Sequence, residues 1–321
     1  MTVDRNSKNF SFPAQLGIFI ALFGAGVIIG ALVSAGIWSG LTGRPLLSIE
    51  SDMTNPKYYN AIMLMQAVDT IIMFFLPVYF FALICYRNPN RFMGFKTSIN
   101  YKQIFWVLII LFFTFPLSGA LAELTNIIPI PKNLEIKFKA MEAAREAQEA
   151  ALININTLSK YLISLLLIGV LPGIVEEVFF RGGLQNILMR WFKGPWFAII
   201  LTSVIFSIIH LSYYGFFVRA ALGGILGLIF YYTGSLWLSI LVHFLYNGIQ
   251  VTALYITSTS IKKIPKDIEQ SFPVWMGAVA LIILFFAFKK LKEISKVQQQ
   301  KFIYEPPKNP DDFHDWIADQ S

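Results

Sequence analysis

The sequence contains very little cysteine and little charge. Cys85 is the single cysteine among 321 residues, which rules out an intramolecular disulfide and any metal cluster built from cysteines. Asp, Glu, Lys and Arg make up only 14% of the chain, whereas soluble domains contain about 25%. Hydrophobic residues make up 56%, and the mean hydropathy is +0.60. The composition therefore excludes an ordinary soluble domain and indicates a polytopic membrane protein.

Five long segments lack Asp, Glu, Lys and Arg entirely. They are residues 14–43, 103–122, 194–218, 220–260 and 272–288. Since a membrane-spanning helix needs about 20 apolar residues, the segment 220–260 must contain two spans. The pattern predicts an all-α polytopic membrane protein with about eight transmembrane helices. The expected spans are 15–38, 60–85, 103–122, 158–190, 195–212, 217–232, 235–257 and 273–288.

The net charge of +7 is spread over loops and the C-terminal tail. This distribution favours anionic lipid headgroups over nucleic acid as the partner of the basic surface. The loop 86–102 contains only positive charges, so the positive-inside rule places it in the cytoplasm. The tail is basic from Lys289 and acidic further on, and it is also expected in the cytoplasm.

Residues 132–151 are rich in helix-forming residues and carry many charges. Ile136, Phe138 and Met141 give one side of this segment a weak apolar character. We therefore expect a helix at or above the membrane surface. It could be a lid over a site or a solvated connector, and we favour the connector.

Two adjacent glutamates lie inside an otherwise apolar segment. Glu176 and Glu177 follow the uncharged residues 161–175, and Arg181 comes four residues after Glu177. Helical spacing places Glu177 and Arg181 on one face. A carboxylate at mid-membrane depth costs about 2.5–3.5 kcal/mol even on the mildest insertion scale. We expect a chain that keeps two such groups to use at least one.

Two of the three histidines also lie within predicted spans. His243 and Asn247 are one helical turn apart, and His210 ends the segment Phe206-Ser-Ile-Ile-His. Polar groups inside a membrane must be satisfied by one another or by trapped water. We expect these side chains to meet the two glutamates around one hydrated cavity. Carboxylates and imidazoles act as general acids and bases, and Asn and His can donate to an oxyanion. The set can activate water against an acyl carbon.

Several motifs that would indicate other chemistry are missing. The sequence has no Gly-x-Ser-x-Gly and no His-Glu-x-x-His, so a serine hydrolase elbow and the common zinc-protease helix are unsupported. Asp69 is the only aspartate in the middle of a predicted span, which argues against an aspartyl dyad. A zinc ion held by Glu176, His210 and His243 remains chemically possible, because two histidines and one carboxylate form a competent ligand set.

Three motifs in this order resemble a known family. They are Glu176-Glu177-x-x-x-Arg181, Phe206-x-x-x-His210 and His243-x-x-x-Asn247. The pattern is similar to the signature motifs of the CPBP intramembrane proteases, also called Abi or CAAX amino-terminal protease-like proteins, which include the CAAX prenyl endopeptidase. The resemblance covers residues 160–250.

The resemblance implies a glutamate-dependent endopeptidase that needs no metal or other cofactor. It implies that Glu176 activates water with the help of His210, and that His243 and Asn247 stabilise the oxyanion. Its substrate would be a membrane-associated peptide or protein, and a bacterial inner membrane is the expected location. No nucleic-acid partner is expected.

The supporting residues follow from the same resemblance. Glu177 and Arg181 would orient the catalytic groups, and Phe206 would pack beside them. We expect a catalytic core of four helices within a chain of three regions. These are an N-terminal membrane region (1–157), the CPBP-like core (158–257), and a last span with a basic-then-acidic tail (258–321).

Two other classes of function stay open. The first is a membrane protein that binds a partner or confers bacteriocin immunity without proteolysis. The second is a transporter or channel, because intramembrane acids also form proton and ion relays. A transporter would require Asp69, whereas an endopeptidase would require Glu176.

Overall fold

The computed structural model describes residues 7–8, 10–95, 98–152, 157–192, 194–259 and 272–304. Within these ranges the chain is helical and contains no β-strand; Ser7 and Tyr86 form an isolated β-bridge. The prediction of an all-α protein is confirmed. The acidic part of the predicted tail and the loop at 260–271 lie outside the described residues.

The α-helices occur in the following order along the chain. They are α1 (Phe12–Thr42), α2 (Ile49–Asp52), α3 (Tyr59–Thr70), α4 (Leu76–Cys85), α5 (Pro89–Phe92), α6 (Tyr101–Ile127), α7 (Lys132–Leu152), α8 (Leu158–Ser164), α9 (Leu171–Glu177), α10 (Asn186–Phe192), α11 (Pro195–Ile208), α12 (Phe216–Thr233), α13 (Leu236–Thr259) and α14 (Val274–Tyr304). Two 3₁₀ segments, η1 (Leu46–Ser48) and η2 (Pro56–Tyr58), flank α2. Three π-helical segments, η3 (Ile71–Phe75), η4 (Leu165–Val170) and η5 (Val178–Gln185), join α3 to α4, α8 to α9, and α9 to α10.

Local sequence signals explain where several helices begin and end. Asn100 and Gln103 form a reciprocal capping box at the start of α6. Ser11 caps α1 through its side chain and precedes a proline in the first turn. Gly43 and Gly234 end α1 and α12 in the left-handed conformation that glycine adopts without steric cost.

Seven helices in the described part of the chain are long and apolar enough to cross a membrane. They are Phe12–Thr42, Tyr59–Cys85, Tyr101–Ile127, Leu158–Phe192, Phe216–Thr233, Leu236–Ser258 and Val274–Ser295. The remaining predicted span, 195–212, is shorter than expected because α11 has 14 residues and ends at Ile208. At 1.5 Å per residue, such a helix is about 21 Å long and does not by itself cross a hydrocarbon core of about 30 Å. The chain is an integral membrane protein.

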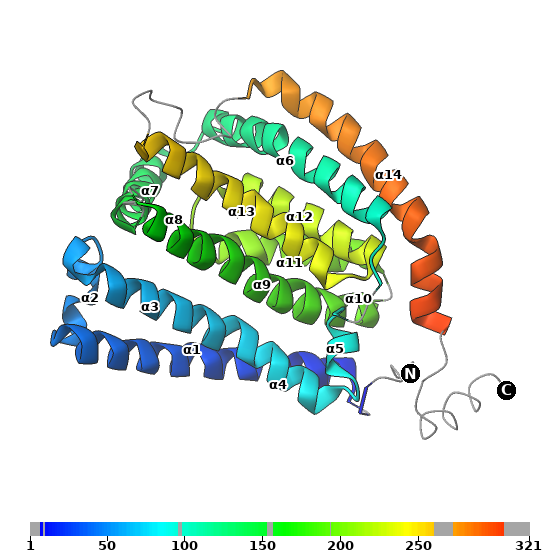
Figure 1. The fold of residues 1–321 in the computed structure, drawn as a ribbon, viewed down its shortest axis with the longest axis horizontal. Coiled ribbons are helices and arrows are strands. Elements are labelled where there is room, and N and C mark those ends of the chain that lie inside the picture. The colour runs from blue at the N-terminus through cyan, green and yellow to red at the C-terminus, as the bar shows by residue number, and fades with distance from the viewer. Residues whose placement is uncertain are drawn as a thin grey trace.

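The helices form layers (Figure 1). Helix α1 packs along α3, η3 and α4 on one side of the molecule, and α6 pairs with α14 on the other. Between these pairs lies a group of helices made of α8 to α10, α11, α12 and α13. Within this group, α13 packs on η4 and α9, and α11 packs on α12. The motif residues lie on this central group.

Aromatic packing joins the N-terminal pair to the central group. Phe179 in η5 lies 5.0 Å from Phe19 and Phe23 of α1 and 5.1 Å from Phe74 of η3, between ring centroids. A side chain at Gly26 of α1 would come within 2.8 Å of the Ile72 carbonyl oxygen. Glycine is therefore required there for α1 to approach η3.

Helix α7 lies at one end of the bundle (Figure 1). Its bounds, Lys132–Leu152, agree with the predicted surface helix. Phe138 stacks on Tyr213, and Glu142 accepts a hydrogen bond from Ser212. The helix is therefore attached to the core at these two points, while most of its other described side chains are exposed, as expected of a solvated connector.

Candidate active site

The buried centre of the site is an ion pair between neighbouring helical turns. Arg181 Nη1 donates to Glu177 Oε1 at 2.5 Å, and both side chains are almost completely buried, with exposed fractions of 2% and 0%. Arg181 Nη2 also donates to the carbonyl oxygen of Gly223 in α12 at 2.9 Å. The guanidinium carbon lies 5.2 Å from the ring centroid of Phe206 in α11. Arg181 thus ties together three helices of the central group.

His243 joins α13 to this ion pair. Its Nδ1 lies 2.9 Å from Glu177 Oε1, the oxygen that also accepts from Arg181. Because a carboxylate only accepts hydrogen bonds, the ring nitrogen is the donor. That hydrogen bond fixes the ring so that Nε2 faces Glu176, with 3.9 Å between Nε2 and Glu176 Oε2. The imidazole therefore lies between two carboxylates that are adjacent in sequence.

The two glutamates occupy different environments. Glu177 is completely buried, whereas the Glu176 side chain keeps an exposed fraction of 16%. Glu177 Oε2 has no hydrogen-bond partner within the described residues. Glu177 is held in place by two donors, and Glu176 remains reachable by water. Of the two carboxylates, Glu176 is therefore the more accessible and Glu177 the more firmly held.

A change of helix type helps to place these side chains. The π-helical segment η5 begins directly after Glu177, and η4 ends directly before α9. A π-helical turn contains more residues than an α-helical turn and shifts the faces of the flanking helices, and such segments are frequent at functional sites. Both glutamates thus lie in one short α-helical piece between two π-helical ones.

His210 lies just beyond the end of α11. Its Nδ1 is 2.7 Å from the Phe206 carbonyl oxygen, so this bond leaves the other ring nitrogen for a second partner. The Phe206 ring neighbours both histidines, with centroids 4.9 Å from His210 and 6.0 Å from His243. Phe206 is buried and also contacts Arg181.

Asn247 lies one turn after His243 on α13. Its Nδ2 donates to the carbonyl oxygen of Ile168 in η4 at 3.3 Å. The amide nitrogen has two hydrogens, so this bond leaves one for another acceptor. Asn247 therefore connects α13 to the helix that carries the glutamates.

The predicted set lies on α9, η5, α11 with the turn that follows it, and α13. Two contacts and one backbone conformation could not be predicted from sequence. The contacts are those of Arg181 with the Gly223 carbonyl and of Asn247 with the Ile168 carbonyl, which pair a side chain with a backbone group distant in sequence. The conformation is the positive φ of 50° at Leu211, next to His210.

The metal alternative can be compared with the donor geometry. Within the described residues, no group of three or more His, Cys, Asp or Glu side chains is arranged to hold a metal ion. His243 has one ring nitrogen bonded to Glu177 and the other 3.9 Å from Glu176. Zinc ligands lie about 2.0–2.2 Å from the metal, so Glu176, His210 and His243 would have to rearrange to bind one.

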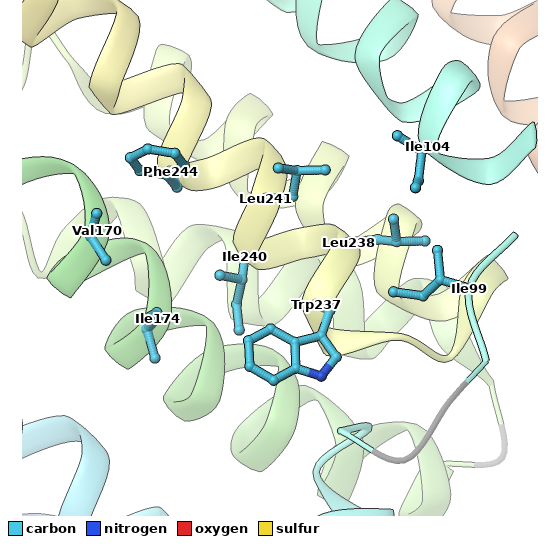
Figure 2. Close-up of a pocket in the computed structure, with 9 residues that line it drawn as sticks. All are labelled: Ile99, Ile104, Val170, Ile174, Trp237, Leu238, Ile240, Leu241 and Phe244. Carbon is cyan, nitrogen blue, oxygen red and sulfur yellow. The ribbon is translucent and has the colours of Figure 1, made fainter. Parts of the chain in front are cut away.

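An apolar pocket of about 360 Å³ lies on another side of α13 (Figure 2). Its walls come from α9, η4, the start of α6 with Ile99 two residues before it, and α13, and none of the polar site residues lines it. The lining residues are Ile99, Ile104, Val170, Ile174, Trp237, Leu238, Ile240, Leu241 and Phe244. Phe244 follows His243, and the two side chains point to different faces of α13. The pocket neighbours the site but contains none of its chemistry.

Comparison with known proteins agrees with the motifs. Residues 158–249 match the family model described as Type II CAAX prenyl endopeptidase Rce1-like. No curated protein and no solved structure matches the chain. The matched segment begins at α8 and includes Glu176, His210, His243 and Asn247. The match confirms, over residues 158–249, the resemblance to the CPBP family of CAAX protease-like membrane proteins that the three motifs indicate.

Proposed function

We propose that this protein is an intramembrane endopeptidase that hydrolyses a peptide bond with water activated by Glu176. The observation that carries the proposal is the fixed position of His243. Glu177 holds its Nδ1 at 2.9 Å, and Nε2 faces the partly exposed Glu176 at 3.9 Å. A base that water can reach, beside an oriented imidazole, supplies the parts of general acid–base catalysis. The family match supports a protease.

The roles of the residues follow from these positions and from the family resemblance. Glu176 removes a proton from water, assisted by His210, and the water oxygen forms a bond to the scissile carbonyl carbon. The carbonyl electron pair moves to oxygen, and the side chains of His243 and Asn247 stabilise this oxyanion. The carbon–nitrogen bond then breaks, and Glu176 returns its proton to the leaving amine.

The other residues orient this group. Glu177 and Arg181 set the His243 ring, and Phe206 excludes water from the far side of both imidazoles. We further propose the division into an N-terminal membrane region (1–157), the catalytic core (158–257) and a last span with its tail (258–321). The substrate is a membrane-associated peptide or protein in a bacterial inner membrane, and the proposal requires no prenyl group on it.

The test is a comparison of protein termini in membranes from cells that contain wild-type protein or Glu176→Gln. This substitution keeps the size and hydrogen bonding of the side chain and removes the base. Glu123→Gln is the matched control, because Glu123 lies on the exposed side of α6 near its end. New N- or C-termini are expected with wild type and Glu123→Gln, and none with Glu176→Gln.

Each outcome separates the hypotheses. Cleavage that persists with a chelator supports the glutamate mechanism, and cleavage that stops with it supports a metal held by Glu176, His210 and His243. Equal termini in all three strains, with each protein expressed, would refute the endopeptidase. A biological effect that survives Glu176→Gln would instead favour a partner-binding or immunity protein.

A further inference from the structure

The segment that carries His210 is held in an unusual conformation. The backbone N–H groups of Ile209, His210 and Leu211 still bond to carbonyls of α11. Leu211 then adopts φ 50°, and it is the only non-glycine residue with positive φ in the described part of the chain. Side chains with a Cβ disfavour this left-handed region, and such residues persist where the surrounding contacts hold them. The turn that follows His210 is therefore held by contacts outside α11, whereas His210 itself keeps its bonds to Phe206 and Ser207 of that helix.

One set of these contacts comes from the start of α12. Ser207 Oγ donates to the Phe216 carbonyl at 2.6 Å, and Ser212 Oγ accepts from the Gly215 N–H at 3.0 Å. The two bonds close the turn between α11 and α12. Both bonds lie within the α11–α12 connection, so other contacts of the turn with the rest of the molecule must come from another element.

The other contacts come from α7, which is distant in sequence. Ser212 Oγ donates to Glu142 Oε2 at 2.8 Å, across 70 residues of chain. The rings of Phe138 and Tyr213 are stacked, with centroids 4.7 Å apart and an interplanar angle of 4°. A polar and an aromatic contact, one helical turn apart on α7, thus hold the two residues that follow Leu211.

The charge of Glu142 is itself stabilised. Arg145 pairs with its other oxygen, and the Glu142 side chain keeps an exposed fraction of only 16%. Burial works to raise the pKa of Glu142, but hydrogen bonds from Arg145 and Ser212 and the charge of Arg219 outweigh it and hold the pKa below its usual value. The acceptor for Ser212 is therefore a carboxylate, which forms stronger hydrogen bonds than a neutral group.

We propose that α7 is a clamp for the catalytic turn, and that Glu142 and Phe138 are positioning residues that aim His210 at Glu176 through Ser212 and Tyr213. The inference rests on the proposed endopeptidase function. It assigns a role in catalysis to a helix that lies outside residues 158–249, where the family match is found. Positioning errors of about 1 Å can lower a rate roughly 100-fold.

The first test compares three variants of the full-length protein on a synthetic peptide that spans the cut site found in the terminus comparison. Glu142→Ala is expected to lower kcat roughly 10- to 100-fold with KM nearly unchanged, because His210 is misplaced but the substrate still binds. Glu142→Gln keeps an oxygen acceptor for Ser212 and should restore most of kcat. Glu135→Ala removes an exposed ion pair with Lys139 on the same helix and should have no effect.

A double-variant comparison shows whether the effect passes through the Ser212 hydrogen bond. Ser212→Ala alone should lower kcat, and Glu142→Ala with Ser212→Ala should lower it no further than the stronger single variant does. If the two single-variant losses in kcat instead multiply in the double variant, the two residues act separately and the clamp is refuted.

A second measurement does not depend on catalysis. Phe138→Cys with Tyr213→Cys should be joined by a short bifunctional thiol reagent in membranes, and each single-cysteine variant reports any reaction through Cys85, which is buried. A clamp predicts that the joined protein is more active than the same variant before the reagent is added, because the link restores the attachment that the two substitutions remove. Loss of activity that returns when the link is cleaved would overturn the clamp, because it would mean that α7 must move as a lid.

The failures can be told apart. If wild type and Glu176→Gln both leave the peptide uncut, the proposed function fails and the clamp fails with it. If wild type cuts and Glu142→Ala cuts equally well, only the clamp is refuted. Crosslinking that fails while cleavage continues would show that the α7 contact is absent in membranes, and would also refute it.

Discussion

Replacing Arg181 by methionine should destabilise the protein severely. Methionine has a similar length but cannot donate to Glu177, so the completely buried carboxylate loses its cation. Removing one partner of a buried pair costs about 3–5 kcal/mol, because the remaining charge is uncompensated. The Gly223 carbonyl also loses its donor, which costs about 1–3 kcal/mol where no water replaces it. The contributions share one side chain and are not additive.

The assay is thermal unfolding of the purified protein in detergent, followed by intrinsic tryptophan fluorescence. A loss of about 4 kcal/mol corresponds to a fall in Tm of roughly 10 °C. The matched control is Arg44→Met, which breaks a pair with Asp52 in which the arginine side chain is 45% exposed. Exposed pairs contribute about 0–1 kcal/mol, so the control should lower Tm by no more than a few degrees.

A second variant tests the cause. Glu177→Gln combined with Arg181→Met removes both charges, and it should recover part of the lost Tm because no uncompensated charge remains. A single Arg181→Met variant that melts within 2 °C of wild type would contradict the reasoning. So would a double variant that is less stable than the single one.

Three further predictions concern other parts of the molecule. The pKa of Glu142 is lowered in the folded protein, so this carboxylate stabilises the fold at pH values above the pKa of a glutamate in the unfolded chain, about 4.5. The stabilisation is lost as the pH falls from there through the lower pKa of the folded state. In a series of thermal melts, the Tm difference between wild type and Glu142→Gln should therefore close below about pH 4.5. Gly26→Ala should lower the free energy of unfolding by about 1–3 kcal/mol, because the added Cβ would meet the Ile72 carbonyl oxygen. Gly24→Ala is the control: its Cβ meets nothing within 4 Å, so its Tm should equal or slightly exceed that of wild type. Asp69→Asn should leave peptide cleavage intact without lowering Tm, because Asp69 Oδ1 is buried and has no hydrogen-bond partner among the residues that the structure describes. Loss of function with intact folding would instead support a relay through Asp69.

The sequence by itself determined the class of protein and the candidate residues. A chain with 56% hydrophobic residues must place its long apolar segments in a membrane, and the segments found that way correspond to helices of the structure. An ionisable residue inside such a segment stands out because it costs free energy there. Glu176, His210 and His243 were found for that reason, and their order along the chain indicated the family.

Only the tertiary structure decided which of these groups touch. Spacing within one helix predicted the contact of Glu177 with Arg181, since both lie on one face four residues apart. It could not predict that His243 bonds to Glu177 and faces Glu176, because this depends on how α13 packs against α9. The π-helical segments on both sides of α9 change the faces of the helix, and no simple periodicity in the sequence marks them.

The role of α7 shows the same limit. Its composition predicted a helix correctly, but its charge favoured a connector exposed to solvent. The structure keeps most described side chains of α7 exposed and, in addition, places Glu142 against Ser212 and Phe138 against Tyr213. Contacts across 70 residues are set by the packing of the whole bundle, and local sequence carries no signal for them. Propensity and hydropathy thus determined the elements of this protein, whereas the packing between the elements determined the geometry of its site.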